Sequence, residues 1–176
     1  MYRWFSISRV HRDGEVVLGP RGPEFTARIV AELLDARRVC PTYGPLYGLA
    51  GQLEASVLDD PASANRHLTQ AFQLAQCDSG ACYFAARQQA LDGRLDESTR
   101  TFARYLDLSG SFNDVISVYV NDANRPDLAM ALARGNRERL GSLAAALARH
   151  PEHEALAKQA GNEALELLKQ IGRAHV

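Results

Sequence analysis

The stretch that decides the fold runs from Ser79 to Phe112 and reads SGACYFAARQQALDGRLDESTRTFARYLDLSGSF. It begins with an Ala-rich helical run, breaks at Asp92-Gly93, and continues as a second amphipathic run. The segment directly before it, 45–78, has the same length and the same layout, with its break at Asp59-Asp60-Pro61. A repeat of this length predicts stacked helix hairpins, because one hairpin cannot bury its apolar face alone.

A third copy follows the first two at a slightly shorter spacing. Its Arg125-Pro126-Asp127 echoes Arg94-Leu95-Asp96 of the second copy. The sequence therefore predicts an all-α chain of antiparallel helix hairpins. Its expected divisions are an arm and linker at 1–22 and a helical repeat domain at 23–176, with repeats at 45–78 and 79–112, a degenerate repeat at 111–135, and closing helices at 136–172.

The segment 1–22 differs from the rest. Asp13-Gly14 stands between β-prone residues and predicts a tight hairpin turn, so we expect a short β-hairpin or extended arm. Gly19-Pro20 and Gly22-Pro23 then break the chain before a helix predicted from Pro23 to Cys40. Further along, Asp60, Asp78 or Ser79, and Gly135-Asn136 are expected to cap helices, and Gly93 to end one.

Composition describes a globular protein without a strong charge signal. Hydrophobic residues make up 46% and charged residues 23%, and the formal net charge is -1. This balance gives no bulk reason to expect nucleic acid or an anionic membrane as a partner. No apolar run approaches the ~20 residues of a membrane span. We expect a cytoplasmic protein if Met1 is the native start, and a periplasmic or envelope location if the chain is a fragment of a membrane protein.

The chain has three cysteines, Cys40, Cys77 and Cys82. An odd count argues against a full disulfide framework. Cys77 and Cys82 flank the short turn 78–81, so a disulfide between them is expected in an oxidising compartment. In the cytosol, both are expected to be buried small apolar residues.

The segment 79–112 resembles a tetratricopeptide repeat. Such repeats have small residues on the first helix, a glycine in the turn, and a small-to-large pattern on the second helix; the matching residues are Ala85, Ala86, Gly93, Ser98, Phe102 and Leu106. In 45–78 the matching residues are Gly51, Ala64, Leu68 and Ala71. The characteristic tryptophan is absent, since Gly48 and Cys82 stand at its place. The resemblance implies a superhelix whose concave groove is lined by the first helix of each hairpin.

A second resemblance rests on one loop. The stretch 38–46, RVCPTYGPL, followed by a repeat array, resembles the soluble helical tails of bacterial O-antigen polymerase or ligase proteins. This resemblance implies an accessory domain of an envelope polysaccharide-assembly protein.

Two pairs of residues are candidates for binding a partner. Tyr83 and Arg87 lie one helical turn apart on the first helix of the repeat 79–112, where the resemblance places groove residues. Lys158 and Asn162 resemble two positions of the carboxylate clamp of co-chaperone repeats. The alternative for each pair is a packing or solvent-facing role.

Metal sites and catalytic motifs are poorly supported. His150 and His153 are separated by Pro151 and lack a third ligand, and a set of Cys40, His67, Cys77 and Cys82 does not have the spacing of a zinc knuckle. No nucleophile elbow, phosphate-binding loop or dinucleotide fingerprint is present. We therefore assign no catalytic residue, no metal and no cofactor.

These observations favour a non-catalytic protein-interaction or scaffolding module that binds a peptide or partner in a helical groove. The identity of the partner and the oligomeric state are left open. The first alternative is the envelope polysaccharide domain, and the second is a helical enzyme of unknown class.

Overall fold

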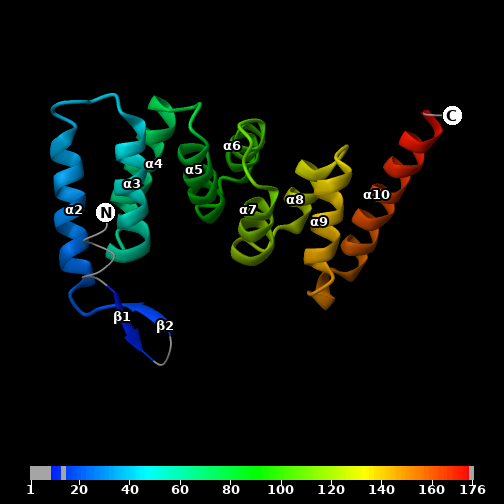
Figure 1. The fold of residues 1–176 in the computed structure, drawn as a ribbon, viewed down its shortest axis with the longest axis horizontal. Helices are drawn as coiled ribbons and strands as arrows, with labels where there is room; N and C mark the ends of the chain where they lie inside the picture. Colours follow the sequence, from blue (N-terminus) through cyan, green and yellow to red (C-terminus); the bar gives the residue numbers. More distant parts are fainter. Residues whose placement is uncertain (1–8, 13–14, 175–176) are drawn as a thin grey trace. The chain divides into compact units, whose positions relative to one another are not determined.

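A computed structural model describes residues 9–12 and 15–174, and most of these residues are helical, as the sequence predicted (Figure 1). The chain divides into two compact units, Met1–Ala85 and Ala86–Val176, and each is described by itself. The boundary falls inside helix α5 (Ser79–Leu91), which therefore contributes residues to both units. None of the described helices has both the length and the apolar character needed to cross a membrane.

The first unit has a strand pair followed by helices. In chain order its elements are β1 (Arg9–Arg12), β2 (Glu15–Leu18), α2 (Gly22–Ala36), α3 (Gly44–Leu53), a π-helical turn η1 (Glu54–Leu58), α4 (Pro61–Leu74) and the start of α5. The two strands pair antiparallel, with Arg12 opposite Glu15. Asp13-Gly14, the expected hairpin turn, lies outside the described residues, so the turn stays a prediction.

Helix α2 ends earlier than expected. It stops at Ala36 and not at Cys40, and every residue from Arg37 to Tyr43 is exposed. Val39, which continues the apolar spacing of α2, is 90% exposed. The predicted helix extended to Cys40 because of the spacing of its apolar residues. In the described part of the chain no neighbouring element covers the residues directly after Ala36, so the spacing does not lead to burial there. The chain turns before Pro41, whose ring disfavours a helical residue in front of it.

Small residues allow α3 and α4 to pack closely. A Cβ atom added to Gly44 would lie 2.4 Å from Ala75 Cβ, and one added to Gly51 would lie 2.7 Å from Leu68 Cγ. The core around this contact consists of buried side chains of α2, α3, α4 and α5: Val30, Leu46, Tyr47, Ala50, Leu53, Ala71 and Ala81. The small residues expected at helix contacts thus have that role in this unit.

The second unit contains the end of α5 and the remaining helices. These are α6 (Leu95–Asp107), α7 (Phe112–Ile116), a π-helical turn η2 (Ser117–Asp122), α8 (Pro126–Ala133), α9 (Arg137–Leu147), a 3-10 turn η3 (Pro151–His153) and α10 (Glu154–Ala174). The last α-helix thus begins at Glu154, after the 3-10 turn that Pro151 opens. Phe102 is fully buried, and its ring meets that of Tyr119 edge-on at 5.3 Å.

Four helix corners share one backbone feature. Asp59, Gly93, Asn124 and Gly135 have positive φ angles of 52°, 77°, 49° and 78°. Each is followed by one non-helical residue and then by the first residue of α4, α6, α8 or α9. Left-handed backbone is least costly for glycine and tolerated by Asn and Asp, which are the residues found here. From Asp59 to Asn124 the corners follow the spacing of the sequence repeats, whereas the corner at Gly135 before α9 does not.

The expected helix caps are confirmed. The side-chain carboxylates of Asp60 and Asp78 accept the backbone N–H groups of Ser63 and Ala81 at 3.0 and 2.7 Å. Asn136 Oδ1 accepts the backbone N–H of Arg139 at 3.1 Å. Hydrogen bonds to the Ser63 backbone and side chain lower the pKa of the Asp60 carboxyl below its ordinary value.

Candidate functional site

Arg87, the first binding candidate, forms an ion pair with a residue of the next hairpin. Its Nε atom donates to Asp122 Oδ2 at 3.2 Å, and its Nη2 atom lies 3.1 Å from the same oxygen. Arg87 lies on α5 and Asp122 ends η2, and their side chains are 40% and 32% exposed. The pair is accessible to solvent, so its net contribution to stability is about 1 kcal/mol or less.

Tyr83 lies one turn before Arg87 on α5, within the first unit. It is partly buried, and its ring meets that of Phe84 edge-on with centroids 4.9 Å apart. Tyr83 and Arg87 fall on opposite sides of the unit boundary. Their joint role in a groove therefore stays a prediction.

Lys158 and Asn162, the clamp candidates, are both exposed on α10. Lys158 Nζ lies 2.6 Å from Glu154 Oε1, one turn earlier on the same helix, and both side chains are about 70% exposed. A neighbouring carboxylate competes with any carboxylate that the lysine would bind. The clamp role stays a prediction, and the geometry around Lys158 does not add to it.

The two cysteines beside the 78–81 turn differ in burial. Both are thiols in the structure, Cys82 buried and Cys77 exposed. Cys82 Sγ donates a hydrogen bond to the carbonyl of Gln76 at 3.5 Å. The expectation that both are buried in a reducing compartment is therefore wrong for Cys77, because the chain after α4 runs over the surface. The disulfide stays a prediction for an oxidising compartment.

The residues considered for metal binding do not come together. Among the described residues, no group of three or more His, Cys, Asp or Glu side chains is placed to hold an ion. His150 and His153 have ring centroids 6.0 Å apart, and His150 Nδ1 lies 3.5 Å from Glu152 Oε1. His67 approaches a carboxylate instead of the cysteines.

That carboxylate belongs to Glu54, which the sequence analysis did not single out. His67 Nδ1 lies 2.7 Å from Glu54 Oε2, and their side chains are 14% and 6% exposed. Glu54 opens the π-helical turn η1. The ring of Tyr47 lies 6.2 Å from that of His67. The contact joins η1 to α4 and gives the buried Glu54 side chain a hydrogen-bond partner, which is the usual condition for burying a polar group.

In the second unit, Tyr119 is a buried polar residue in a π-helical turn, as Glu54 is in the first. It lies in the π-helical turn η2, and its hydroxyl contacts Ser98 Oγ at 2.9 Å and Thr99 Oγ1 at 3.1 Å. Ser98 Oγ also donates to the carbonyl of Ala86 at 2.8 Å. Burial raises the pKa of the Tyr119 hydroxyl, while the two hydrogen bonds partly offset this. These bonds satisfy a buried polar group, and the arrangement is structural.

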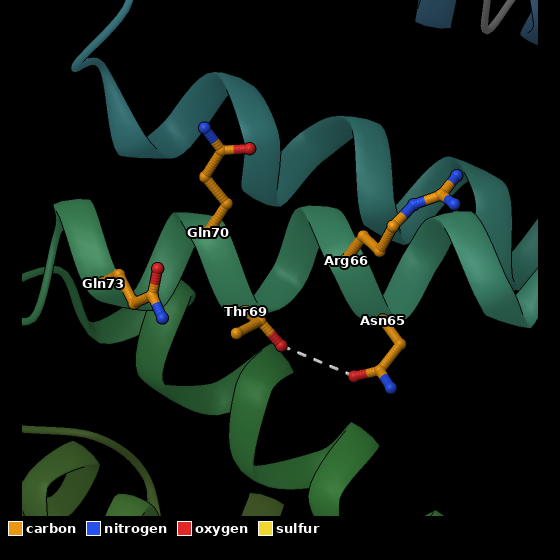
Figure 2. Close-up of a pocket in the computed structure, with 5 residues that line it drawn as sticks. All are labelled: Asn65, Arg66, Thr69, Gln70 and Gln73. Carbon is orange, nitrogen blue, oxygen red and sulfur yellow. Dashed lines mark hydrogen bonds between the residues drawn. The ribbon is translucent and has the colours of Figure 1, made fainter.

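Two polar surface hollows are lined by residues of the described part of the chain. The first, of about 410 Å³, lies over α4 alone and is lined by Asn65, Arg66, Thr69, Gln70 and Gln73 (Figure 2). Thr69 Oγ1 and Asn65 Oδ1 are 3.5 Å apart in it. The second, of about 340 Å³, lies between α7 and α9 in the second unit and is lined by Ser111, Phe112, Asn113, Asn136, Glu138, Arg139 and Ser142.

The second hollow was not predicted from the sequence. Its residues come from two separate segments, 111–113 and 136–142, and none belongs to a recognised motif. The one local signal was an arginine near the capped start of a helix, which is common at protein surfaces. Only packing of α7 on α9 brings Phe112 and Arg139 together.

Comparison of the chain with protein families, with curated proteins and with solved structures finds no match.

Proposed function

We propose that this chain is a non-catalytic protein-interaction module of the tetratricopeptide-repeat type, which binds a peptide or partner along the first helices of its hairpins. The observation that carries the proposal is the Arg87–Asp122 ion pair. In the repeat assignment, α5 and η2 belong to the first helices of successive hairpins. The pair therefore stands where the resemblance places the groove.

The Arg87–Asp122 ion pair leaves one donor group and one acceptor atom available for a partner. The contacts of Arg87 Nε and Nη2 both go to Asp122 Oδ2, so Arg87 Nη1 and Asp122 Oδ1 have no hydrogen-bond partner among the described residues. A partner can therefore offer a carboxylate to Arg87 and a donor to Asp122 without breaking the pair. Charged hydrogen bonds of this kind contribute more to binding than neutral ones.

The recurring helix corners support the repeat assignment. Each sequence repeat has a left-handed residue, Asp59, Gly93 or Asn124, at the corner between the two helices of its hairpin. A repeat protein uses such equivalent corners to present equivalent helix faces. Binding through preformed helix faces would need little rearrangement.

The test is selection of a displayed random peptide library on the whole chain. We expect a family of related peptides to be enriched, and the Arg87→Glu variant to lose affinity for them by about tenfold or more, because it turns a charged donor into a repelling acid. Affinity is read by fluorescence anisotropy, and the melting temperature by circular dichroism.

The matched control is Arg100→Glu. Arg100 is exposed on α6, the second helix of the same hairpin, so this variant changes the net charge equally and should bind the peptides normally. The proposal fails if no peptide is enriched, or if both variants lose affinity alike. A large fall in melting temperature for Arg87→Ala would instead make Arg87 a packing residue.

A further inference from the structure

The hollow between α7 and α9 contains an arginine whose environment differs from that of its counterparts. Four arginines of the described part of the chain are partly buried, namely Arg87, Arg94, Arg125 and Arg139. The first three each form an ion pair with a carboxylate, at 3.1, 2.8 and 2.8 Å. Arg139 has no carboxylate partner among the described residues.

Arg139 is held in place by weaker contacts. Its Nη1 donates to the carbonyl of Leu132 at 3.4 Å, and its guanidinium lies over the ring of Phe112 at 6.0 Å from the centroid. A guanidinium has five N–H donors, and these two contacts use few of them. A partly buried cation with donors to spare and an aromatic ring beneath it is suited to bind an anion.

The other lining groups restrict which anion fits. Ser111, Asn113 and Ser142 offer hydroxyl and amide donors around the arginine, and Phe112 offers an apolar surface. Glu138 adds a negative charge at the same hollow, and it opposes a dianion such as phosphate more strongly than a singly charged group. Asn136 Oδ1 already caps α9 through Arg139 N, so the start of the helix is satisfied from within the chain.

We infer that this hollow binds a carboxylate attached to an apolar group, with the carboxylate on Arg139 and the apolar group on Phe112. Its volume of about 340 Å³ suits one side chain or the last residue of a peptide. The identification of a peptide as the source of the carboxylate rests on the proposed function. Binding of a carboxylate in this hollow is inferred from its lining residues and does not depend on that function.

The first experiment uses small probes and needs no partner. The whole chain, labelled with 15N, is titrated with N-acetyl-phenylalanine, with the amide of the same compound, and with inorganic phosphate. We expect saturable shifts of the Phe112, Asn113 and Arg139 amide signals with the acid only, and their loss in Arg139→Gln. The inference is overturned if the acid gives no saturable shift, if acid and amide act alike, or if phosphate binds as tightly.

The matched control is Arg137→Gln. Arg137 is exposed near the start of α9, and it lies outside the lining of the hollow. This variant loses the same charge and should bind the acid normally. If Arg137→Gln weakens binding as much as Arg139→Gln, the effect is one of net charge and the inference fails.

The second experiment identifies the source of the carboxylate. Peptides selected on the chain are compared as free acids, as C-terminal amides, and with Asp and Glu replaced by Asn and Gln. Either C-terminal amidation or replacement of the acidic side chains should weaken binding by about tenfold to a hundredfold, the effect of one charged hydrogen bond. The same change in the peptide should cause no further loss of affinity for the Arg139→Gln variant. Peptides that depend on Arg87 but not on Arg139 would uphold the proposed function and refute this inference for peptides.

Discussion

Tyr119 and Glu54 are single residues that the fold buries although both carry polar atoms. Tyr119 has its hydroxyl among Ser98 and Thr99, and Glu54 has its carboxylate against His67. Both lie in π-helical turns, where the backbone is shifted relative to an ordinary helix. In each case the polar group is buried together with a partner, which is the condition for burying it at a small cost.

Tyr119→Phe tests the role of the buried hydroxyl. Because burial raises its pKa, the hydroxyl keeps its proton in the folded state at pH values where the unfolded chain loses it. The stability it contributes is therefore fully present below about pH 10, the ordinary pKa of tyrosine, and is lost as pH rises towards the folded-state pKa. We expect the variant to lose about 1 kcal/mol at pH 7 and to show a shallower alkaline decline.

The measurement is urea unfolding followed by circular dichroism from pH 7 to pH 11. The exposed Tyr43→Phe serves as the control and should follow the original chain at every pH. An alkaline decline of equal steepness in Tyr119→Phe would show that this hydroxyl does not govern it.

At the scale of helices and turns, sequence chemistry predicted the capped starts of helices better than the end of α2 or the helix interiors. Asp60, Asp78 and Asn136 cap helices as expected, because a cap depends only on neighbouring residues. The end of α2 and the π-helical turns at Glu54–Leu58 and Ser117–Asp122 were not predicted. They depend on which neighbours cover the helix, and periodicity within one segment does not contain that information.

The candidate site residues were likewise predicted only in part from the sequence. Arg87 could be placed on a first helix from the repeat pattern, but its partner Asp122 lies in the next hairpin and was not foreseen. Arg139 and Phe112 meet only through tertiary packing of α7 and α9. Residue type and helix assignment can nominate a surface residue, whereas its partner and its degree of burial require the fold.

Gly44→Ala tests the close contact of α3 and α4. The added Cβ would lie 2.4 Å from Ala75 Cβ and 3.0 Å from the carbonyl oxygen of Ala71, neither of which can rotate away. We expect a loss of about 1–3 kcal/mol in the free energy of unfolding, although alanine favours helix. Urea denaturation at pH 7 measures it.

The matched control for this substitution is Gly141→Ala in α9. A Cβ added at Gly141 meets nothing within 4 Å, so helix propensity should stabilise that variant by up to about 1 kcal/mol. Equal effects of the two substitutions would mean that α3 and α4 do not approach as closely as described.

At the scale of the whole molecule, α5 is the element that both compact units use. Its Ala81 packs with Leu46 and Tyr47 in the first unit, and its Ala86 carbonyl accepts the hydrogen bond of Ser98 in the second. We expect a helix that contributes to two cores to couple their unfolding, because neither core is complete without it.

Native-state hydrogen exchange tests this coupling. We expect the most protected amides of α3 and α4 and those of α8 and α9 to exchange with the same opening free energy. Gly44→Ala alters only the first unit, but it should lower the opening free energies of the α3 and α4 amides and of the α8 and α9 amides by the same amount. Lowered protection confined to α3 and α4 would show that the units open independently.

The two π-helical turns also bear on how related chains should be aligned with this one. A π-type turn closes over five residues where an α turn closes over four, so it holds one residue more. A related chain that lacks one residue within Glu54–Leu58 or Ser117–Asp122 could form an ordinary helix there and keep the corner that follows. A single-residue gap elsewhere in these helices would instead rotate every later side chain by about 100°.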